Sequence, residues 1–150
     1  MSESSKPVFF VDECCLGIQV VEVLRSAGAS VEIHSDHFPS GKPDVEWLAE
    51  VSQKGWLVIT KDNKISRNTS EQMSIAIANA KVFIWATGSA SRNKLVRDLE
   101  GSVVAMERFA ISQPSPFIAK VYPYGKVQLW KHRDKLLKVL RQNIGIDEGT

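Results

Sequence analysis

The 150-residue sequence predicts one α/β domain built around a mostly parallel sheet. Two short apolar runs, at residues 8–11 and 56–59, are rich in β-branched and aromatic side chains, and acidic residues follow each run within three positions. Runs of this kind are typical of strands that are buried on both faces of a parallel sheet. Segments with helical periodicity alternate with the apolar runs, which is the order expected of strand–helix–strand units.

The composition fits a globular protein that holds its core without disulfides, since 43% of the residues are hydrophobic and 24% are charged. A net charge of +2 permits a nucleic-acid partner but does not require one. The two cysteines, Cys14 and Cys15, are adjacent, which suits neither a structural disulfide nor a Cys/His zinc site. No stretch approaches about 20 apolar residues, and the first residues lack an apolar secretion signal. We therefore expect a cytoplasmic protein that makes no membrane contact.

The first part of the chain divides into elements at clear sequence signals. Apolar residues from Leu16 to Ala27 share one helical face, and Gly28 ends that pattern. Prolines and Gly41 oppose a helix in the loop of residues 34–43, and the next helical pattern opens at Asp44. The elements expected in this part are strand 8–11, helix 16–27, strand 31–33, helix 44–54, strand 56–59, helix 70–80 and strand 81–85.

The later part of the chain has a different pattern. A helix capped by Ser89 or Ser91 is expected to run toward Leu99, and a short strand is expected at residues 103–106. Residues 117–122 and 126–130 flank a Pro-Tyr-Gly turn, which predicts a β-hairpin, and a basic helix follows at about residues 132–142. We interpret residues 7–112 as the core of a single domain and residues 113–143 as a hairpin-plus-helix appendage.

Acidic residues gather at the predicted carboxyl ends of the strands. Asp12 and Asp62 follow two strands, Glu13 stands beside Asp12, and Asp44 opens the helix between those strands. The carboxyl ends of parallel strands meet at one edge of a sheet, so these acids are expected to lie close together. Clustered carboxylates repel one another unless a cation is present, and hard cations such as Mg²⁺ and Mn²⁺ prefer oxygen ligands. The pattern therefore predicts a divalent-metal site.

Simpler explanations exist for some of these residues. Asp44 follows a proline at a helix start, where a capping or first-turn acid is common, and Asp62 fits an ordinary turn. The segment from His34 to His37 resembles a metal-ligand cluster, but without further Cys or His partners it is better explained as a surface loop or a lip beside the site. The basic helix at the C-terminal end is explained either by a solvated lysine face or by binding of RNA or an acidic partner.

Three motifs in order carry a family resemblance: Phe-Phe-Val-Asp12-Glu13, then Pro-Asp44-Val-Glu-Trp-Leu-Ala, then Gly-Trp-Leu-Val-Ile-Thr60-Lys61-Asp62. Over about residues 8–90 the chain resembles the PIN-like nuclease superfamily, and more narrowly the compact PIN-like toxins of bacterial toxin–antitoxin pairs. The resemblance implies a three-layer α/β/α fold, Mg²⁺- or Mn²⁺-dependent endoribonuclease activity, an RNA substrate and an antitoxin partner. It implies Asp12, Asp44 and Asp62 as metal ligands and adds Glu13 to the catalytic acids.

Residues around the third strand are candidates for substrate binding. Thr60 matches a small hydroxyl residue that the superfamily has two positions before its last acid. The basic side chains that follow the third strand, Lys61, Lys64 and Arg67, can contact phosphates or form a solvated surface. The candidate substrate-binding residues are Thr60, Lys61, Asn63, Lys64 and Arg67. The chain departs from the family pattern after the strand at residues 81–85, where Thr87 and Ser89 stand and no acid is found.

Two other classes of protein compete with the nuclease hypothesis. A receiver-like phosphoacceptor module also ends its first strand in paired acids and its third in Asp, but residues 103–109 lack the Lys-Pro that such modules carry after a fifth strand. A catalytically degenerate PIN-like module would bind RNA or a protein without cleaving RNA. The sequence also leaves open whether the chain forms a homodimer.

Overall fold

The computed structural model describes residues 7–11, 18–39, 41–60, 68–85, 92–122 and 125–143. Its centre is a six-stranded sheet in the order β2-β1-β3-β4-β5-β6, in which only β6 runs antiparallel to its neighbour. The strands are β1 (Val8–Val11), β2 (Ser30–Ile33), β3 (Leu57–Thr60), β4 (Lys81–Trp85), β5 (Phe117–Tyr122) and β6 (Lys126–Lys131).

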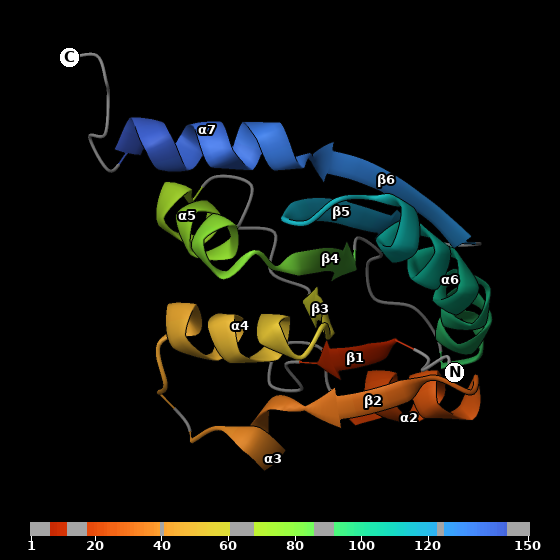
Figure 1. Cartoon of the computed structure of the whole chain (residues 1–150). Coiled ribbons are helices and arrows are strands. Elements are labelled where there is room, and N and C mark those ends of the chain that lie inside the picture. The colour runs from red at the N-terminus through yellow and green to blue at the C-terminus, as the bar shows by residue number, and fades with distance from the viewer. Residues whose placement is uncertain are drawn as a thin grey trace, which may run out of the picture.

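Helices cover both faces of this sheet. They are α2 (Ile18–Ser26), α3 (His34–His37), α4 (Asp44–Gln53), α5 (Thr69–Ala78), α6 (Arg92–Ser112) and α7 (Arg133–Asn143). Figure 1 shows α4, α5 and α7 stacked along one side of the sheet, while α2 and α6 lie on the other side. The expected three-layer α/β/α arrangement is therefore present. Among the described helices, none is both long and apolar enough to cross a membrane.

Two hydrophobic cores fill the spaces between the layers, because successive side chains of a strand point to opposite faces. In β1, Phe9 and Val11 pack with α2 and α6, whereas Phe10 packs with α4 and α5. The two cores continue across the sheet into β5, where Ala119 belongs to the first core and Ile118 to the second. We call the second side the α4/α5/α7 face.

Apart from residues 103–106, the strand and hairpin predictions are confirmed, with shifts of one or two residues at some ends. The hairpin is more than an appendage, since β5 pairs in parallel with β4 and extends the central sheet. The short strand predicted at Val103–Met106 is wrong, because those residues lie within the 21-residue helix α6. Val103, Met106 and Ala110 are buried at helical spacing, while Val104 is half exposed, so the periodicity is that of a helix.

A close approach of two backbones fixes the hairpin against α6. Gly125, in the turn before β6, has a φ of +80°, and a Cβ atom built there would lie 2.6 Å from the carbonyl oxygen of Gly101 in α6. Real Cβ atoms do not come so close to a carbonyl oxygen, so only glycine fits at residue 125 without a local shift.

Candidate functional site

The chain adds β2 on one side of β1 and then adds β3 on the other side. From β1 the chain passes through α2 to β2 on one side, and it then returns through α4 to β3 on the other side. The helices α2 and α4 consequently cover opposite faces. Such a reversal opens a crevice outside the carboxyl ends of the two strands, and this is where α/β proteins bind their ligands. Val11 at the end of β1 pairs with Ile59 near the end of β3, so the two strand ends adjoin at this crevice.

Two of the predicted site residues are described at this edge. Thr60 is the last residue of β3, and its side chain is buried with 9% exposure. Asp44 is the first residue of α4, which runs back from this edge toward the start of β3. Pro43 occupies the N-cap position and makes no side-chain capping bond. Asp44 therefore stands inside the helix start and is not its N-cap.

The other predicted site residues lie outside the described residues: Asp12, Glu13, Lys61, Asp62, Asn63, Lys64 and Arg67. In the sequence, Asp12 comes directly after the last residue of β1, and Asp62 comes two residues after the last residue of β3. Within the described ranges, no group of three or more His, Cys, Asp or Glu residues is placed to hold a metal ion.

Asp98 is an acid that the sequence analysis missed. Its side chain is 2% exposed in α6, and its Oδ1 atom accepts no hydrogen bond. A buried carboxylate oxygen without a donor costs free energy, on the order of 1–3 kcal/mol or more, and a cation would offset this cost. An acidic residue next to Leu99 and four positions before Ser102, on the buried side of an amphipathic helix, was the signal that could have revealed it.

The position of α6 brings Asp98 toward the carboxyl edge of the sheet. Lys81, the first residue of β4, donates a hydrogen bond from Nζ to the carbonyl oxygen of Ala110 at 3.0 Å, so this late turn of α6 lies at the amino edge. Asp98 precedes Ala110 by 12 positions, which is roughly 18 Å along the helix. Because β4 is only roughly 13 Å long, this stretch of α6 is long enough to reach from the amino edge to the carboxyl edge. A buried carboxylate at this edge fits a site that takes a divalent cation.

The histidines of α3 belong to an aromatic cluster on the α4/α5/α7 face. Phe10 lies at its centre, and its ring centroid is 5.9 Å from that of His34, 5.4 Å from that of Trp47 and 5.9 Å from that of Trp56. His37 packs edge-on against Trp56, and its Nε2 lies 2.7 Å from a carboxylate oxygen of Glu32. The histidines thus support the fold, and residues 34–37 form the short helix α3 where a surface loop was expected.

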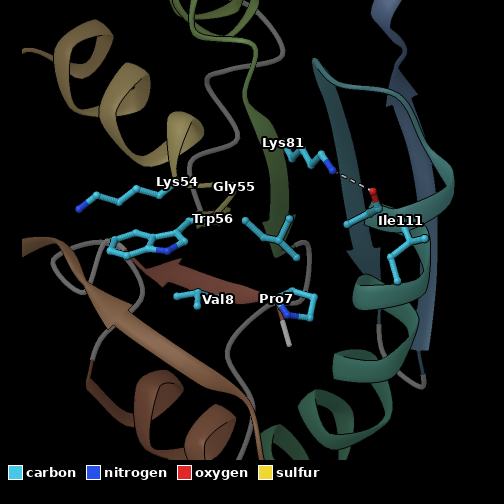
Figure 2. Close-up of a pocket in the computed structure, with 9 residues that line it drawn as sticks. Pro7, Val8, Lys54, Gly55, Trp56, Lys81 and Ile111 are labelled. Atoms are coloured by element: carbon cyan, nitrogen blue, oxygen red, sulfur yellow. Dashed lines mark hydrogen bonds between the residues drawn. The ribbon is translucent and has the colours of Figure 1, made fainter. Parts of the chain in front are cut away.

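A cavity of about 420 Å³ lies at the opposite, amino edge of the sheet. Figure 2 shows Trp56 and Lys54 on one wall and Lys81 and Ile111 on the other, with Pro7 and Val8 between them. It is lined by residues at the starts of β1, β3 and β4 and is therefore separate from the crevice at the carboxyl ends.

Comparison with known proteins agrees with the geometry. The sequence model of the PIN-like domain family matches residues 7–87, and the chain belongs to this family. The matched segment runs from β1 through the end of β4. The acids that suggested a receiver-like module therefore lie in the part of the sequence that matches the PIN-like family.

A relative from Mycobacterium tuberculosis (strain ATCC 25618 / H37Rv), named "Putative ribonuclease VapC45", is 28% identical over 118 residues. The alignment covers 76% of this chain and 85% of the relative. No solved structure matches the chain significantly.

Proposed function

We propose that the protein is a metal-dependent endoribonuclease that hydrolyses RNA phosphodiester bonds, and that it is the toxin of a toxin–antitoxin pair. The observation that carries the proposal is that β1 and β3 end side by side in a PIN-like domain, with Asp12 and Asp62 following those strands in the sequence. The relative named as a ribonuclease supports the same reaction. We also propose an antitoxin partner and a cytoplasmic location, which the similarity to a VapC ribonuclease supports.

Asp12, Asp44 and Asp62 are proposed to hold Mg²⁺ or Mn²⁺, since hard cations take carboxylate oxygens as ligands. When bound, the cation would supply charge neutralisation for the scissile phosphodiester. Asp98, at the same edge, is proposed to add a fourth carboxylate, since this chain lacks the acid that the family pattern has directly after β4. Its buried Oδ1 atom has no hydrogen-bond donor, and an oxygen in this state is a suitable ligand for a hard cation.

The remaining residues are assigned roles that do not depend on the cation. Glu13 is proposed to accept the proton of the attacking water, because it stands next to Asp12 in the sequence and a carboxylate can act as a general base. Thr60, which is buried at the end of β3, is proposed to position the segment that carries Asp62. The side chains of Lys61, Asn63, Lys64 and Arg67 are proposed to contact the phosphates and sugars of the substrate.

The test is an RNA cleavage assay with the purified protein in Mn²⁺ and in EDTA. Cleavage is expected in Mn²⁺ only, and Asp12→Asn or Asp62→Asn is expected to lower the rate by at least about a hundredfold. Asp134→Asn is a matched control, since Asp134 is an exposed acid in the first turn of α7. Cleavage that survives both site substitutions would refute the assignment of these acids.

The role as a toxin needs its own test. Induced expression of the protein in a bacterial host is expected to arrest growth, and Asp12→Asn is expected to abolish the arrest at equal protein levels. Growth arrest that persists in this variant would show that toxicity does not come from the proposed reaction. RNA binding without cleavage in the parent protein would favour the degenerate PIN-like module.

A further inference from the structure

A cationic and aromatic surface lies on the β5–β6 hairpin, on the α4/α5/α7 face of the sheet. Ile118 and Trp130 pack against the core on this face, and side chains at alternate positions share their side. The register pairs Lys120 with Gln128 and Tyr122 with Lys126, which confirms that the two strands present these residues to the same face. We define the hairpin platform as Lys120, Tyr122, Lys126, Gln128 and Trp130.

The platform is accessible along its whole length. Lys126 and Gln128 are exposed, and Lys120, Tyr122 and Trp130 are partly exposed. The helix α7 contacts α5 and buries Leu136 in the core that includes Ile118, so the helical layer covers the hairpin at the start of β5. The part of β5 that follows Ile118 keeps partial exposure on this face, at Lys120 and Tyr122.

The lysines of the platform lie against its aromatic rings. The Nζ atom of Lys120 is 5.6 Å from the ring centroid of Trp130, and that of Lys126 is 5.9 Å from the ring centroid of Tyr122. Lys131, at the end of β6, adds a third ammonium group 4.9 Å from the Trp130 ring. No acid among the described residues forms an ion pair with these lysines, so their positive charge is not neutralised within this part of the protein.

The register connects the platform to the crevice. Thr60 pairs with Ile84, and Ile84 pairs with Lys120. These three residues therefore form a row across β3, β4 and β5 on one face of the sheet. Neighbouring strands are about 4.8 Å apart, so the backbone of Lys120 lies roughly 10 Å from that of Thr60. Tyr122 ends β5 at the carboxyl edge, the edge at which Thr60 ends β3. The platform thus begins a short distance from the proposed cleavage site.

We propose that the hairpin platform binds single-stranded RNA that extends from the cleavage site. Unneutralised lysines attract the phosphate backbone, and the Trp and Tyr rings offer faces on which bases stack. An acidic peptide could use the lysines but would gain nothing comparable from the rings, so the combination favours RNA. The proposal rests on the proposed function, because it assigns a path for the substrate of the same site.

The test measures binding without cleavage. The probe is a fluorescein-labelled single-stranded RNA, and fluorescence anisotropy is measured in EDTA, which removes the cation that the proposed hydrolysis requires. The variant Lys120→Gln/Lys126→Gln is expected to bind about tenfold more weakly than the parent and to lower the salt slope by roughly 1.4, the value for two lysine–phosphate contacts on a single strand. Tyr122→Leu is expected to weaken binding by about fivefold with an unchanged salt slope, since a stacking base is worth about 1–3 kcal/mol.

The matched control is Lys135→Gln/Lys138→Gln on α7, which removes the same charge from two exposed lysines outside the platform. It is expected to leave the affinity within about twofold of the parent. Equal weakening of RNA binding by both double variants would show that net charge alone explains the effect, and it would overturn the proposal. So would displacement of the RNA by poly-glutamate at equal charge concentration, because that result would assign the surface to acidic peptides.

The two proposals fail in distinguishable ways. Cleavage that is insensitive to Asp12→Asn would remove the proposed catalytic site while leaving the anisotropy result unaffected. Unchanged RNA binding in the platform variants would remove the platform while leaving metal-dependent cleavage intact. A melting temperature within a few degrees of the parent is required of each variant, so that loss of binding is not loss of folding.

Discussion

The contact between Gly125 and α6 makes a quantitative prediction about the hairpin. An alanine at residue 125 must adopt a φ of +80°, and this left-handed backbone conformation costs about 1–2 kcal/mol for a residue with a Cβ atom. The new Cβ atom would also meet the carbonyl oxygen of Gly101 at 2.6 Å. A carbonyl oxygen within a helix cannot rotate away as a side chain can, so the turn itself must move.

Displacing a packed segment to admit an extra carbon typically costs about 1–3 kcal/mol. Gly125→Ala is therefore expected to lower the free energy of unfolding by about 2–5 kcal/mol. Gly55 is the matched control, because its φ of +79° is nearly the same and a Cβ atom there would meet nothing within 4 Å. Gly55→Ala should carry the backbone cost alone, about 1–2 kcal/mol.

Urea denaturation followed by tryptophan fluorescence measures both variants, since the chain has four tryptophans. The expected difference between Gly125→Ala and Gly55→Ala is about 1–3 kcal/mol. Equal losses of stability would show that the close approach to Gly101 has no steric cost and would refute the reasoning. A shift of the hairpin in the Gly125 variant should also weaken RNA binding at the platform.

Three further predictions concern the helices. Leu136→Ala should lower the free energy of unfolding by about 2–5 kcal/mol by emptying a fully buried site under α7, whereas the exposed Lys138→Ala should change it by less than about 0.5 kcal/mol, as judged by urea denaturation. Asn68→Ala removes the side-chain oxygen that caps α5 by accepting a hydrogen bond from the Glu71 amide at 3.1 Å, and a loss of about 0.5–2 kcal/mol is expected, with Asn68→Asp retaining the cap. Asp98→Asn should reduce the rise in melting temperature that Mn²⁺ produces in a thermal-shift assay, and an unchanged rise would limit Asp98 to a role in the fold.

Much of the fold followed from local sequence patterns. The apolar runs that became β1, β3 and β4 are short and bounded by polar residues, so their length and ends were visible without tertiary information. The hairpin was predicted from its turn residues. The strand expected at residues 103–106 was wrong because a four-residue window cannot distinguish a strand from a buried stretch of helix, and the helical period shows only over the whole of α6.

The candidate site was only partly predictable. The acids after β1 and β3 were predicted because parallel topology brings strand ends together, and Asp44 was predicted because it opens α4; their role as metal ligands stays a prediction. Asp98 was missed, since its burial depends on how α6 packs against the sheet. The hairpin platform was missed for a related reason, because the distance between Lys120 and Thr60 depends on pairing across three strands and no local motif encodes it.

The place of β6 at the end of the strand order has a consequence for self-association. An outermost strand presents unpaired backbone amides and carbonyls, which can recruit a strand from another molecule and begin aggregation. Lys126 and Lys131 at the two ends of β6, together with the irregular register near Ile118, oppose such recruitment by charge repulsion and by local twist. Lys126 is thus constrained twice, since replacing it would both weaken nucleic-acid binding and make this edge more prone to aggregate at high concentration.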